Sequence, residues 1–333
     1  MGDNSLRVDF WNVGFGDAAV IWLDPYRIVL VDAGPHNSPV VGWVEANGFE
    51  VVCAVVTHND ADHWDGLRRL LRRRGWGVRG WGILQDRPAR SCRDIIDELE
   101  RGVAQRLWVE PFSIAPQPNT PDELLDKPGV KECKRPNGLR LVAVYPTILA
   151  GLRGQLRGPN YAGALLVLYD GERPLVAWPG DLPLEICHQE LVRAKIRPMF
   201  LVGPHHGGPQ DLRRTSQGDV AQKVREIGHD QLWVSVAWHR GRRLPRENYL
   251  RGSRSAGVTI RCSQLTEHCD PEFERFSPGL VPMADWLGID PPPNGVSCMG
   301  PMRVTFADGK AEIAYENEHK MAVTSLHGRL CFP

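Results

Sequence analysis

The sequence predicts an α/β fold in which two sheets pack face to face and helices cover their outer faces. Two strand-rich segments support this prediction, because each ends in a polar turn and continues into a helix-like pattern. The first segment begins near Leu6 and the second near Tyr161. A chain of 333 residues is long enough to bury one large core, with or without an appendage.

The first segment consists of apolar, β-branched runs separated by turns. A run with no alternation is typical of a strand covered on both faces, and a Gly just after an apolar-periodic stretch marks the end of a helix. The expected elements, in chain order, are strands at 6–13, 18–23 and 27–34, a helix at 38–48, a doubly covered strand at 51–57 and a helix from Leu67.

The second segment repeats this order, with strands expected at 161–169 and 174–181 and a helix at 184–196. From about Gly252 the composition changes, and the chain becomes rich in proline and glycine. Two alternating runs then flank Asp308-Gly309, which is a strong hairpin signal. We therefore expect a large domain over residues 1–260 and a smaller C-terminal segment with a β-hairpin over residues 261–333.

Charge and hydropathy exclude several classes of protein. The chain has 40 Lys and Arg against 40 Asp and Glu, so no global field attracts nucleic acid or a membrane. The longest apolar runs are far too short to span a bilayer. The N-terminus lacks the basic-then-apolar pattern of an export signal, so we expect a cytoplasmic protein without membrane association, whose cysteines are not paired in disulfides.

Metal-binding side chains are concentrated directly after the strand at 51–57. His58 and Asp60 are two residues apart, so on an extended strand end their side chains point the same way. Asp62 and His63 follow, and we expect them in a loop that faces the same cavity. Imidazoles and carboxylates together suit zinc, manganese or iron, and at least four such ligands favour two ions over one.

A calcium-binding loop and a solvated polar loop are the other interpretations of this stretch. A calcium-binding loop is excluded, because Asp65 stands where a glycine is required and Leu71 where the terminal glutamate is required. A solvated polar loop remains the alternative. The position at a strand end and the density of ligands both oppose it.

The motif THNDADHWDG resembles the H-x-H-x-D-H signature of the metallo-β-lactamase fold, with Asp60 in place of the second histidine. That aspartate variant is similar to the ComEC-type competence proteins and their soluble relatives. Four further motifs of these proteins occur in the same order, and the resemblance extends from about residue 6 to residue 260. They are FWNVGFGDAAVIW, RIVLVDAG, VAWPGD and LVGPHHGG.

The resemblance implies a metallo-β-lactamase-like αββα sandwich with two divalent ions, zinc or manganese, and a small Cys-containing appendage. It implies that Asp181 bridges the ions and that Asp62 and Asp181 serve in catalysis as well as in metal binding. We expect His58, Asp60 and His205 to hold one ion, Asp62 and His206 with His63 on or near the other, and Asp181 to lie between them. The resemblance implies that Asp17 lies near the ions and that Asp32 orients a ligand from behind, and we expect Asn160 beside the ligands as well.

The family pattern is incomplete at three positions, one of which is Ala164, where a small hydroxylated residue often precedes the strand. The separate third-motif histidine has no counterpart, and the corresponding segment GPNYAGALLV offers Asn160 instead. Leu244 replaces the histidine that usually precedes the proline at position 245. His239 is a candidate substitute as general acid or phosphate contact, although a structural role is equally compatible with the sequence.

The last quarter of the chain contains four cysteines. We expect Cys262, Cys269 and Cys298 to bind one structural zinc ion, with His268, His327 or Cys331 as the fourth ligand. Such a site would stabilise a segment with few apolar residues. Reduced cysteines packed in a core are the alternative.

A two-ion site favours hydrolysis of phosphodiesters, because two cations neutralise the charge that develops on the ester. Between Gly66 and Arg106 the chain has eleven arginines and five acidic residues, and we expect Arg72, Arg73 and Arg74 to bind substrate phosphates. The leading hypothesis is a phosphodiesterase or nuclease that acts on DNA or RNA through a hydroxide activated by two metals, as part of an anti-invader system. A small-molecule phosphodiesterase or lactonase and a non-catalytic metal-binding scaffold are the alternatives.

Overall fold

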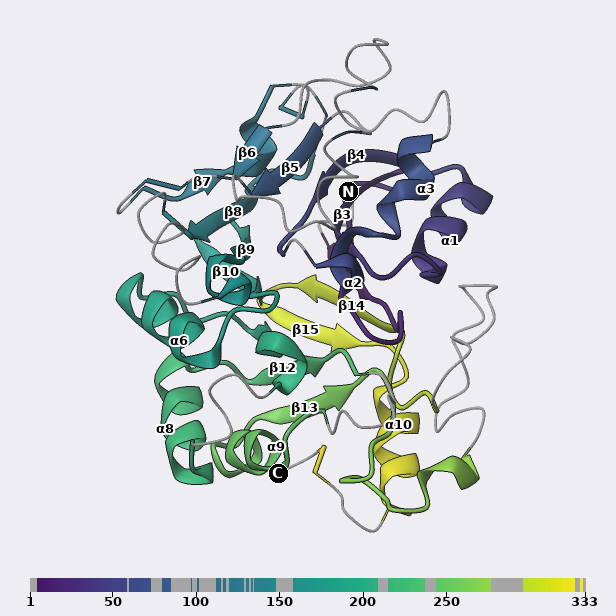
Figure 1. Ribbon diagram of the computed structural model, residues 1–333, viewed down its shortest axis with the longest axis vertical. Helices are drawn as coiled ribbons and strands as arrows, with labels where there is room; N and C mark the ends of the chain where they lie inside the picture. The colour runs from purple at the N-terminus through teal and green to yellow at the C-terminus, as the bar shows by residue number, and fades with distance from the viewer. Residues whose placement is uncertain are drawn as a thin grey trace.

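Two β-sheets packed face to face form the centre of the computed structural model, and helices lie outside them (Figure 1). The sandwich of sheets and outer helices predicted from the sequence is therefore confirmed. The residues that the structure describes are 5–58, 60–72, 80–84, 97, 101, 112–114, 116–117, 120–128, 130–131, 133, 135–147, 158–208, 215–236, 244–276, 296–326 and 330–331.

The first sheet has the strand order β15-β14-β1-β2-β3-β4-β5-β6. Its strands from β3 to β6 run parallel, and its other neighbours pair antiparallel. The bounds are β1 Leu6–Phe10, β2 Ala18–Trp22, β3 Arg27–Ala33, β4 Glu50–Val55, β5 Gly80–Leu84, β6 Phe112–Ile114, β14 Met302–Ala307 and β15 Lys310–Ile313, with helices α1 Pro39–Asn47, α2 Ala61–Trp64 and α3 Leu67–Arg72.

The second sheet has the strand order β13-β12-β11-β10-β9-β8-β7. Strands β10 to β13 run parallel, and β7 to β10 pair antiparallel. The bounds are β7 Asp122–Glu123, β8 Leu139–Tyr145, β9 Leu165–Asp170, β10 Arg173–Trp178, β11 Phe200–Val202, β12 Gln231–Val234 and β13 Thr259–Cys262, with helices α6 Leu184–Arg193, α8 Gln217–Ile227, α9 Glu247–Ser255 and α10 Glu316–Val323 and short 3₁₀ turns at Leu124–Asp126, Pro159–Ala162, Pro204–Gly207 and Phe273–Phe276.

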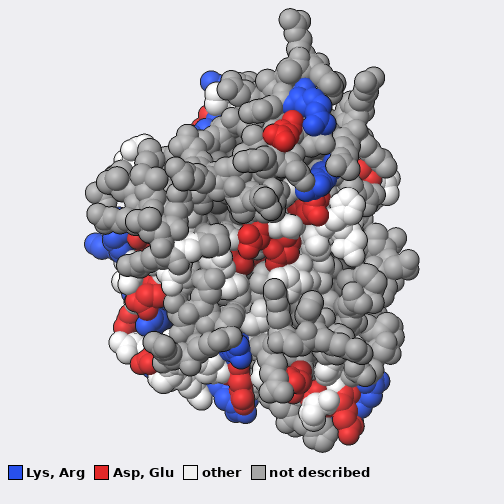
Figure 2. Space-filling model, viewed as in Figure 1, with Lys and Arg blue, Asp and Glu red and all other residues white. Residues whose placement is uncertain are grey.

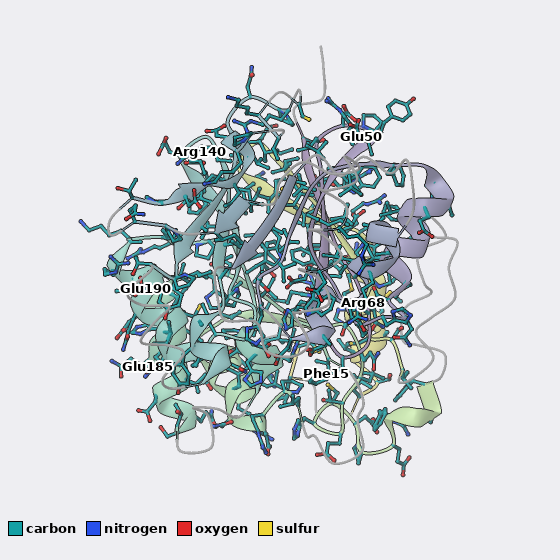
Figure 3. The ribbon with its side chains drawn as sticks, turned by 45° about the horizontal axis from the view of Figure 1, so that its top comes forward. Phe15, Glu50, Arg68, Arg140, Glu185 and Glu190 are labelled. Carbon is teal, nitrogen blue, oxygen red and sulfur yellow. The ribbon has the colours of Figure 1, made fainter. Side chains whose placement is uncertain are left out.

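Three buried apolar clusters separate the four layers. The central cluster joins the facing sides of the two sheets, where Phe10 lies 6.1 Å from Phe200 and 5.7 Å from Trp233 between ring centres. A second cluster packs α1 and α3 on the first sheet, and a third packs α6, α8 and α9 on the second. Helix α6 is amphipathic, and Figure 3 shows Glu185 and Glu190 on its outer side.

Parallel strands bring the polar motifs to a shared edge, because the carboxyl ends of parallel strands point the same way. In the first sheet β3 ends after Asp32, and β4 is followed by His58. In the second sheet β10 is followed by Asp181, and β11 is followed by His205 and His206. The fold thus places the ends of four strands, two from each sheet, around one site.

Several local predictions agree with the structure, and two need correction. Helix α1 ends at Gly48, whose φ of 67° is left-handed, and the hairpin turns at Asp308-Gly309 as expected. Asp62 lies in the one-turn helix α2 and not in a loop, so helical geometry sets its direction. The predicted hairpin pairs with β1 and completes the first sheet, so it does not belong to a separate appendage.

In the part of the chain that the structure describes, no helix is both long enough and apolar enough to cross a membrane.

Candidate metal centre

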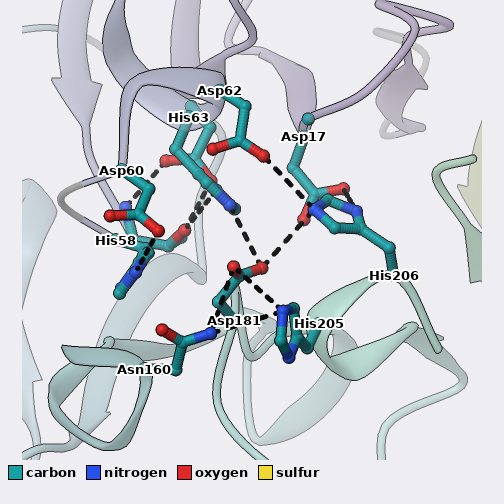
Figure 4. A network of polar contacts seen from close by, with 12 residues as sticks. Asp17, His58, Asp60, Asp62, His63, Asn160, Asp181, His205 and His206 are labelled. Atoms are coloured by element: carbon teal, nitrogen blue, oxygen red, sulfur yellow. Dashed lines mark hydrogen bonds and ion pairs between the residues drawn. The ribbon is translucent and has the colours of Figure 1, made fainter. Parts of the chain in front are cut away.

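Asp181 lies at the centre of the polar residues that the strand ends bring together (Figure 4). Its Oδ1 atom lies 3.2 Å from Nε2 of His63 and 3.4 Å from Nε2 of His206. Its Oδ2 atom lies 3.6 Å from Nε2 of His205, and the amide of Asn160 donates to it at 3.5 Å. The two carboxylate oxygens of Asp181 therefore face two different sets of side chains.

The first ligand group consists of His58, Asp60, His205 and Asp181. Ligand atoms of His58, Asp60 and Asp181 all lie within 4.8 Å of one another, and Nε2 of His58 is 3.4 Å from Oδ2 of Asp60. His58 is buried, whereas the Asp60 side chain is 42% exposed, so this group opens to solvent on the Asp60 side. The Asn160 amide also lies 3.3 Å from Nε2 of His205.

The second ligand group consists of Asp17, Asp62, His63 and His206. Ligand atoms of Asp17, His63 and His206 all lie within 4.8 Å of one another, and all three residues are buried. Nε2 of His206 is 3.8 Å from Oδ2 of Asp62. Asp17, expected near the ions, is thus as close to the imidazoles as a direct ligand would be.

A buried carboxylate fixes the orientation of His63 from behind. Oδ2 of Asp32 lies 2.8 Å from Nδ1 of His63, and Asp32 also accepts hydrogen bonds from the backbone N–H and the hydroxyl of Thr57. An imidazole that donates its Nδ1 proton to Asp32 presents the lone pair of Nε2 to the site. Asp32 has a left-handed φ of 56°, a backbone strain typical of functional positions.

The charges of the second ligand group are strongly coupled. Burial raises the pKa of Asp17 to about 6, although attraction to His206 and His63 opposes this. Burial by itself lowers the pKa of His206, but attraction to the carboxylates of Asp17, Asp62 and Asp181 outweighs it and raises the pKa to about 9. The pKa of His63 is raised in the same way by Asp32 and Asp181 against the effect of burial. Protons on two imidazoles thus balance the buried carboxylates, and a divalent cation would supply the same charge and release those protons.

Buried nitrogens without hydrogen bonds also fit a metal. Nε2 of His58, Nδ1 of His205 and both ring nitrogens of His206 have no hydrogen-bond partner among the described residues. Buried polar atoms are almost always hydrogen-bonded, so several unpaired imidazole nitrogens in one place need an explanation. Imidazoles and carboxylates are the donors that zinc and manganese accept, and the residues present therefore fit divalent ions.

The His-His turn adopts an unusual backbone. His205 has φ 47° and His206 has φ 53°, both left-handed, within the short turn Pro204–Gly207. The N–H of His205 donates to the carbonyl of Gly180 at 2.9 Å, which ties this turn to the one that carries Asp181. Side chains in this conformation cost free energy, and here the strain directs two adjacent imidazoles into one site.

Some predicted site residues are not part of this geometry. His239, Arg73 and Arg74 lie outside the described residues, and so does the side chain of Arg72 at the end of α3. Figure 2 shows acidic side chains gathered in the middle of one face, over the position that α2 has in Figure 1.

Two residues of the site were not predicted from the sequence. Thr57 holds Asp32 through two hydrogen bonds, and the ring of Phe15 lies 5.1 Å from the His206 ring between centres. Thr57 immediately precedes the His58 motif, so its position was a signal. Nothing in the pattern around Phe15 distinguishes it from a core aromatic.

No protein-family model matches the sequence, and no curated protein matches it. Similar solved structures include Igni18, a metallo hydrolase of the archaeon Ignicoccus hospitalis, which is 14% identical with 78% of this chain and 94% of that one covered at a TM-score of 0.47. The metallo-β-lactamase fold protein YhfI of Bacillus subtilis is 13% identical, with coverage of 79% and 98% and a TM-score of 0.46. Zn²⁺-bound PqqB of Methylobacterium extorquens is 14% identical, with coverage of 78% and 99% and a TM-score of 0.46. The fold named for YhfI is the metallo-β-lactamase fold, which the sequence motifs of this chain resemble.

Proposed function

We propose that this protein is a metal-dependent hydrolase that uses two divalent ions, zinc or manganese. One observation supports this above all others: the two carboxylate oxygens of Asp181 face separate groups of imidazoles, with His63 and His206 near Oδ1 and His205 near Oδ2. A carboxylate in that position can bridge two ions. Two ions about 3.5–4 Å apart are typical of hydrolytic sites, where they stabilise both the attacking and the leaving oxygen.

The residues present divide into two sets of donors. His58, Asp60 and His205 would hold one ion, and Asp62, His63 and His206 the other, with Asp181 shared. Asp17 is added to the second set, because it lies among its imidazoles. Divalent ions at such a site supply Lewis acidity and neutralise charge that develops on an attacked ester.

The surrounding residues position these donors. Asp32 holds a proton on Nδ1 of His63, which keeps Nε2 directed at Asp181. Asn160 donates its amide to Asp181 and lies against His205, at the position where the family pattern would place a histidine. An amide there restrains the carboxylate without adding a metal ligand.

The proposed substrates are phosphodiesters in DNA or RNA, and Asp60 supports a place in the ComEC-like subfamily. Two cations suit the charge of a phosphodiester. The Arg-rich segment between Gly66 and Arg106 would supply phosphate contacts.

A small-molecule substrate, such as a small phosphodiester or a lactone, is the second candidate. One observation favours it: Arg68 in α3, which begins beside the metal centre, is paired with Asp65 at 2.5 Å. An arginine whose charge is already balanced contributes less to the attraction of a polyanion, which a small ester does not need.

The test compares substrates and metals on the purified full chain. Metal-depleted protein is loaded with Mn²⁺ or Zn²⁺ and assayed on bis-(p-nitrophenyl) phosphate, on labelled single-stranded DNA, duplex DNA and RNA, and on a lactone. We expect metal-dependent cleavage of bis-(p-nitrophenyl) phosphate and of at least one nucleic acid. Cleavage of the small esters alone would support the second candidate.

The control for the site is a matched pair of variants. Asp181→Asn removes the shared carboxylate charge, and Asp230→Asn changes an exposed aspartate outside the site in the same way. We expect Asp181→Asn to lose at least a hundredfold in rate and Asp230→Asn to retain the parent rate. Equal rates in the two variants, or two bound ions with no cleavage of any substrate, would refute a hydrolytic role and favour a metal-binding scaffold.

A further inference from the structure

A second cluster of metal-binding side chains lies in the C-terminal part of the chain. Ligand atoms of Cys298, His319 and Cys331 all lie within 4.8 Å of one another, and all three residues are buried. Sγ of Cys298 is 3.3 Å from Nε2 of His319. The thiol of Cys269 interacts directly with the thiol of Cys331, which adds a fourth donor to the cluster.

The four donors come from four separate stretches of chain. Cys269 lies in the turn after β13, where its N–H donates to the carbonyl of Thr266 at 2.9 Å. Cys298 precedes β14, and its N–H donates to the carbonyl of Ser263 at 3.0 Å. His319 lies in α10, and the carbonyl of Cys331 accepts from the N–H of Ile260 at 2.7 Å. The N–H of His319 also donates to the carbonyl of Tyr315 at 3.0 Å, so backbone hydrogen bonds hold all four donor residues in place.

The four donors lie in an apolar cluster separate from the three larger ones. Among the described residues its buried members are Leu265, Phe273, Val296, Val323, Leu326 and the three cysteines 269, 298 and 331. A structural metal at this place would cross-link the stretches of chain that meet in the cluster.

We propose that Cys269, Cys298, His319 and Cys331 bind one structural zinc ion. Three thiolates and one imidazole are a standard tetrahedral donor set for zinc, and Zn–S bonds of about 2.3 Å place neighbouring donors about 3.7 Å apart. The present separations of at most 4.8 Å among Cys298, His319 and Cys331 need only a small contraction. A disulfide would use two thiols and leave a buried thiol and imidazole in contact without a role.

This ligand set differs from the one predicted from the sequence at two positions. Cys262 belongs to the core on the outer face of the second sheet, and His268 is half-buried near Glu247, whose pKa it helps to lower. His319 was not predicted, because it lies on an amphipathic helix with no cysteine nearby in sequence. His327, another predicted candidate, lies outside the described residues.

The zinc site would also support the first metal centre through a buried polar network. Nδ2 of Asn12 donates to Oγ of Ser297 at 3.1 Å, and Nε2 of Gln264 donates to Oδ1 of Asn12 at 3.0 Å. Ser297 adjoins Cys298, and Asn12 begins the loop that carries Asp17. The zinc-bound segment thus holds the loop that positions a residue of the other site.

Cobalt substitution tests the proposal on the intact protein. Thiolate-to-cobalt charge transfer produces a near-ultraviolet band, and the first metal centre contains no cysteine, so the band reports this cluster alone. We expect the purified unmodified chain to contain one zinc ion beyond the ions of the first centre, and to show the band once Co²⁺ has replaced that zinc ion. Absence of the band in folded, reduced protein would overturn the proposal.

A matched pair of variants locates the ligands. Cys298→Ser combined with Cys331→Ser removes two proposed ligands. Cys187→Ser is the control, because it changes an equally buried thiol on α6 that packs in the core of the second sheet and not in the cysteine cluster. We expect the first variant to lose one zinc per chain and the band, and the second to retain both. His319→Ala should weaken zinc retention against a chelator at least tenfold. Zinc retained equally in all variants, or a disulfide between Cys269 and Cys331 in the purified protein, would refute the assignment.

Discussion

The close approach of the Gly-rich loop to α2 can be tested at a single residue. Gly16 has φ 127°, and a Cβ built on it would lie 2.0 Å from the carbonyl oxygen of Asp62. Real Cβ atoms essentially never come closer than 3.0 Å to such an atom, so Gly16→Ala must separate the loop from α2 by at least about 1 Å. Asp17 follows Gly16 directly, so the change moves two proposed ligands, Asp17 and Asp62, away from each other.

The magnitude follows from metal geometry and from backbone strain. Metal–ligand distances tolerate deviations of about 0.2 Å, so a displacement of about 1 Å should remove at least one ligand from the second group. The left-handed backbone and the forced contact together should cost about 3 kcal/mol of unfolding free energy. We therefore expect Gly16→Ala to bind fewer than two ions per chain at the first centre and to unfold at lower denaturant concentration than the parent.

Gly14→Ala is the matched control, because Gly14 lies in the same loop with φ 77° but a Cβ there meets nothing within 4 Å. It should cost only the strain of a left-handed alanine, about 1 kcal/mol, and leave the metal content intact. Elemental analysis after dialysis and chemical denaturation of both variants measure the difference. If Gly16→Ala retains the metal content and stability of Gly14→Ala, the close approach does not set the position of Asp62.

Two further predictions concern stability away from the metal centres. Arg303→Leu should lower the free energy of unfolding by about 3 kcal/mol in chemical denaturation, because it removes the ion-pair partner that contacts the buried Asp9 at 2.7 Å. Adding Asp9→Asn should recover part of the loss, and no recovery would mean that packing dominates. Burial lowers the pKa of His229 to about 3, and neither ring nitrogen has a hydrogen-bond partner among the described residues. As the pH falls below about 6.5, the unfolded chain therefore binds a proton on His229 that the folded chain does not. Between pH 7 and pH 5 the free energy of unfolding of the parent should fall by about 2 kcal/mol relative to that of His229→Leu. Parallel pH dependences of the free energy of unfolding in the two proteins would contradict this.

The sequence predicted the sheets well because their patterns are local. Strands β3, β4 and β10 are continuous apolar runs that end in polar motifs, and such runs belong to strands covered on both faces. The hairpin was equally clear, because its turn residues stand between two alternating runs. The sequence did not show that the hairpin pairs with β1. This pairing joins residues nearly 300 positions apart, so no local pattern indicates it.

The two metal clusters were predictable to different degrees for the same reason. Most residues of the first centre directly follow parallel strands, so the topology that places the strands also gathers the residues. Each donor of the C-terminal cluster comes from a different stretch of chain. Cys269 lies in a turn, Cys298 precedes β14, His319 lies in α10, and Cys331 follows α10, so no single element brings them together. Only three-dimensional packing shows that His319, and not His268, faces Cys298.

The packing also argues against treating residues 261–333 as a separate unit. Strand β14 pairs with β1, and Arg303 on β14 binds Asp9 of β1, to which Trp22 of β2 also donates a hydrogen bond at 2.8 Å. Phe306 of the same strand packs on Phe200 in the core between the sheets, with ring centres 5.8 Å apart. The C-terminal segment therefore supplies two strands of the first sheet and part of the central core. Strand β1 leads directly into the loop that carries Asp17. A change that loosens the C-terminal segment should therefore weaken metal binding at the first centre, although it alters none of the ligands there.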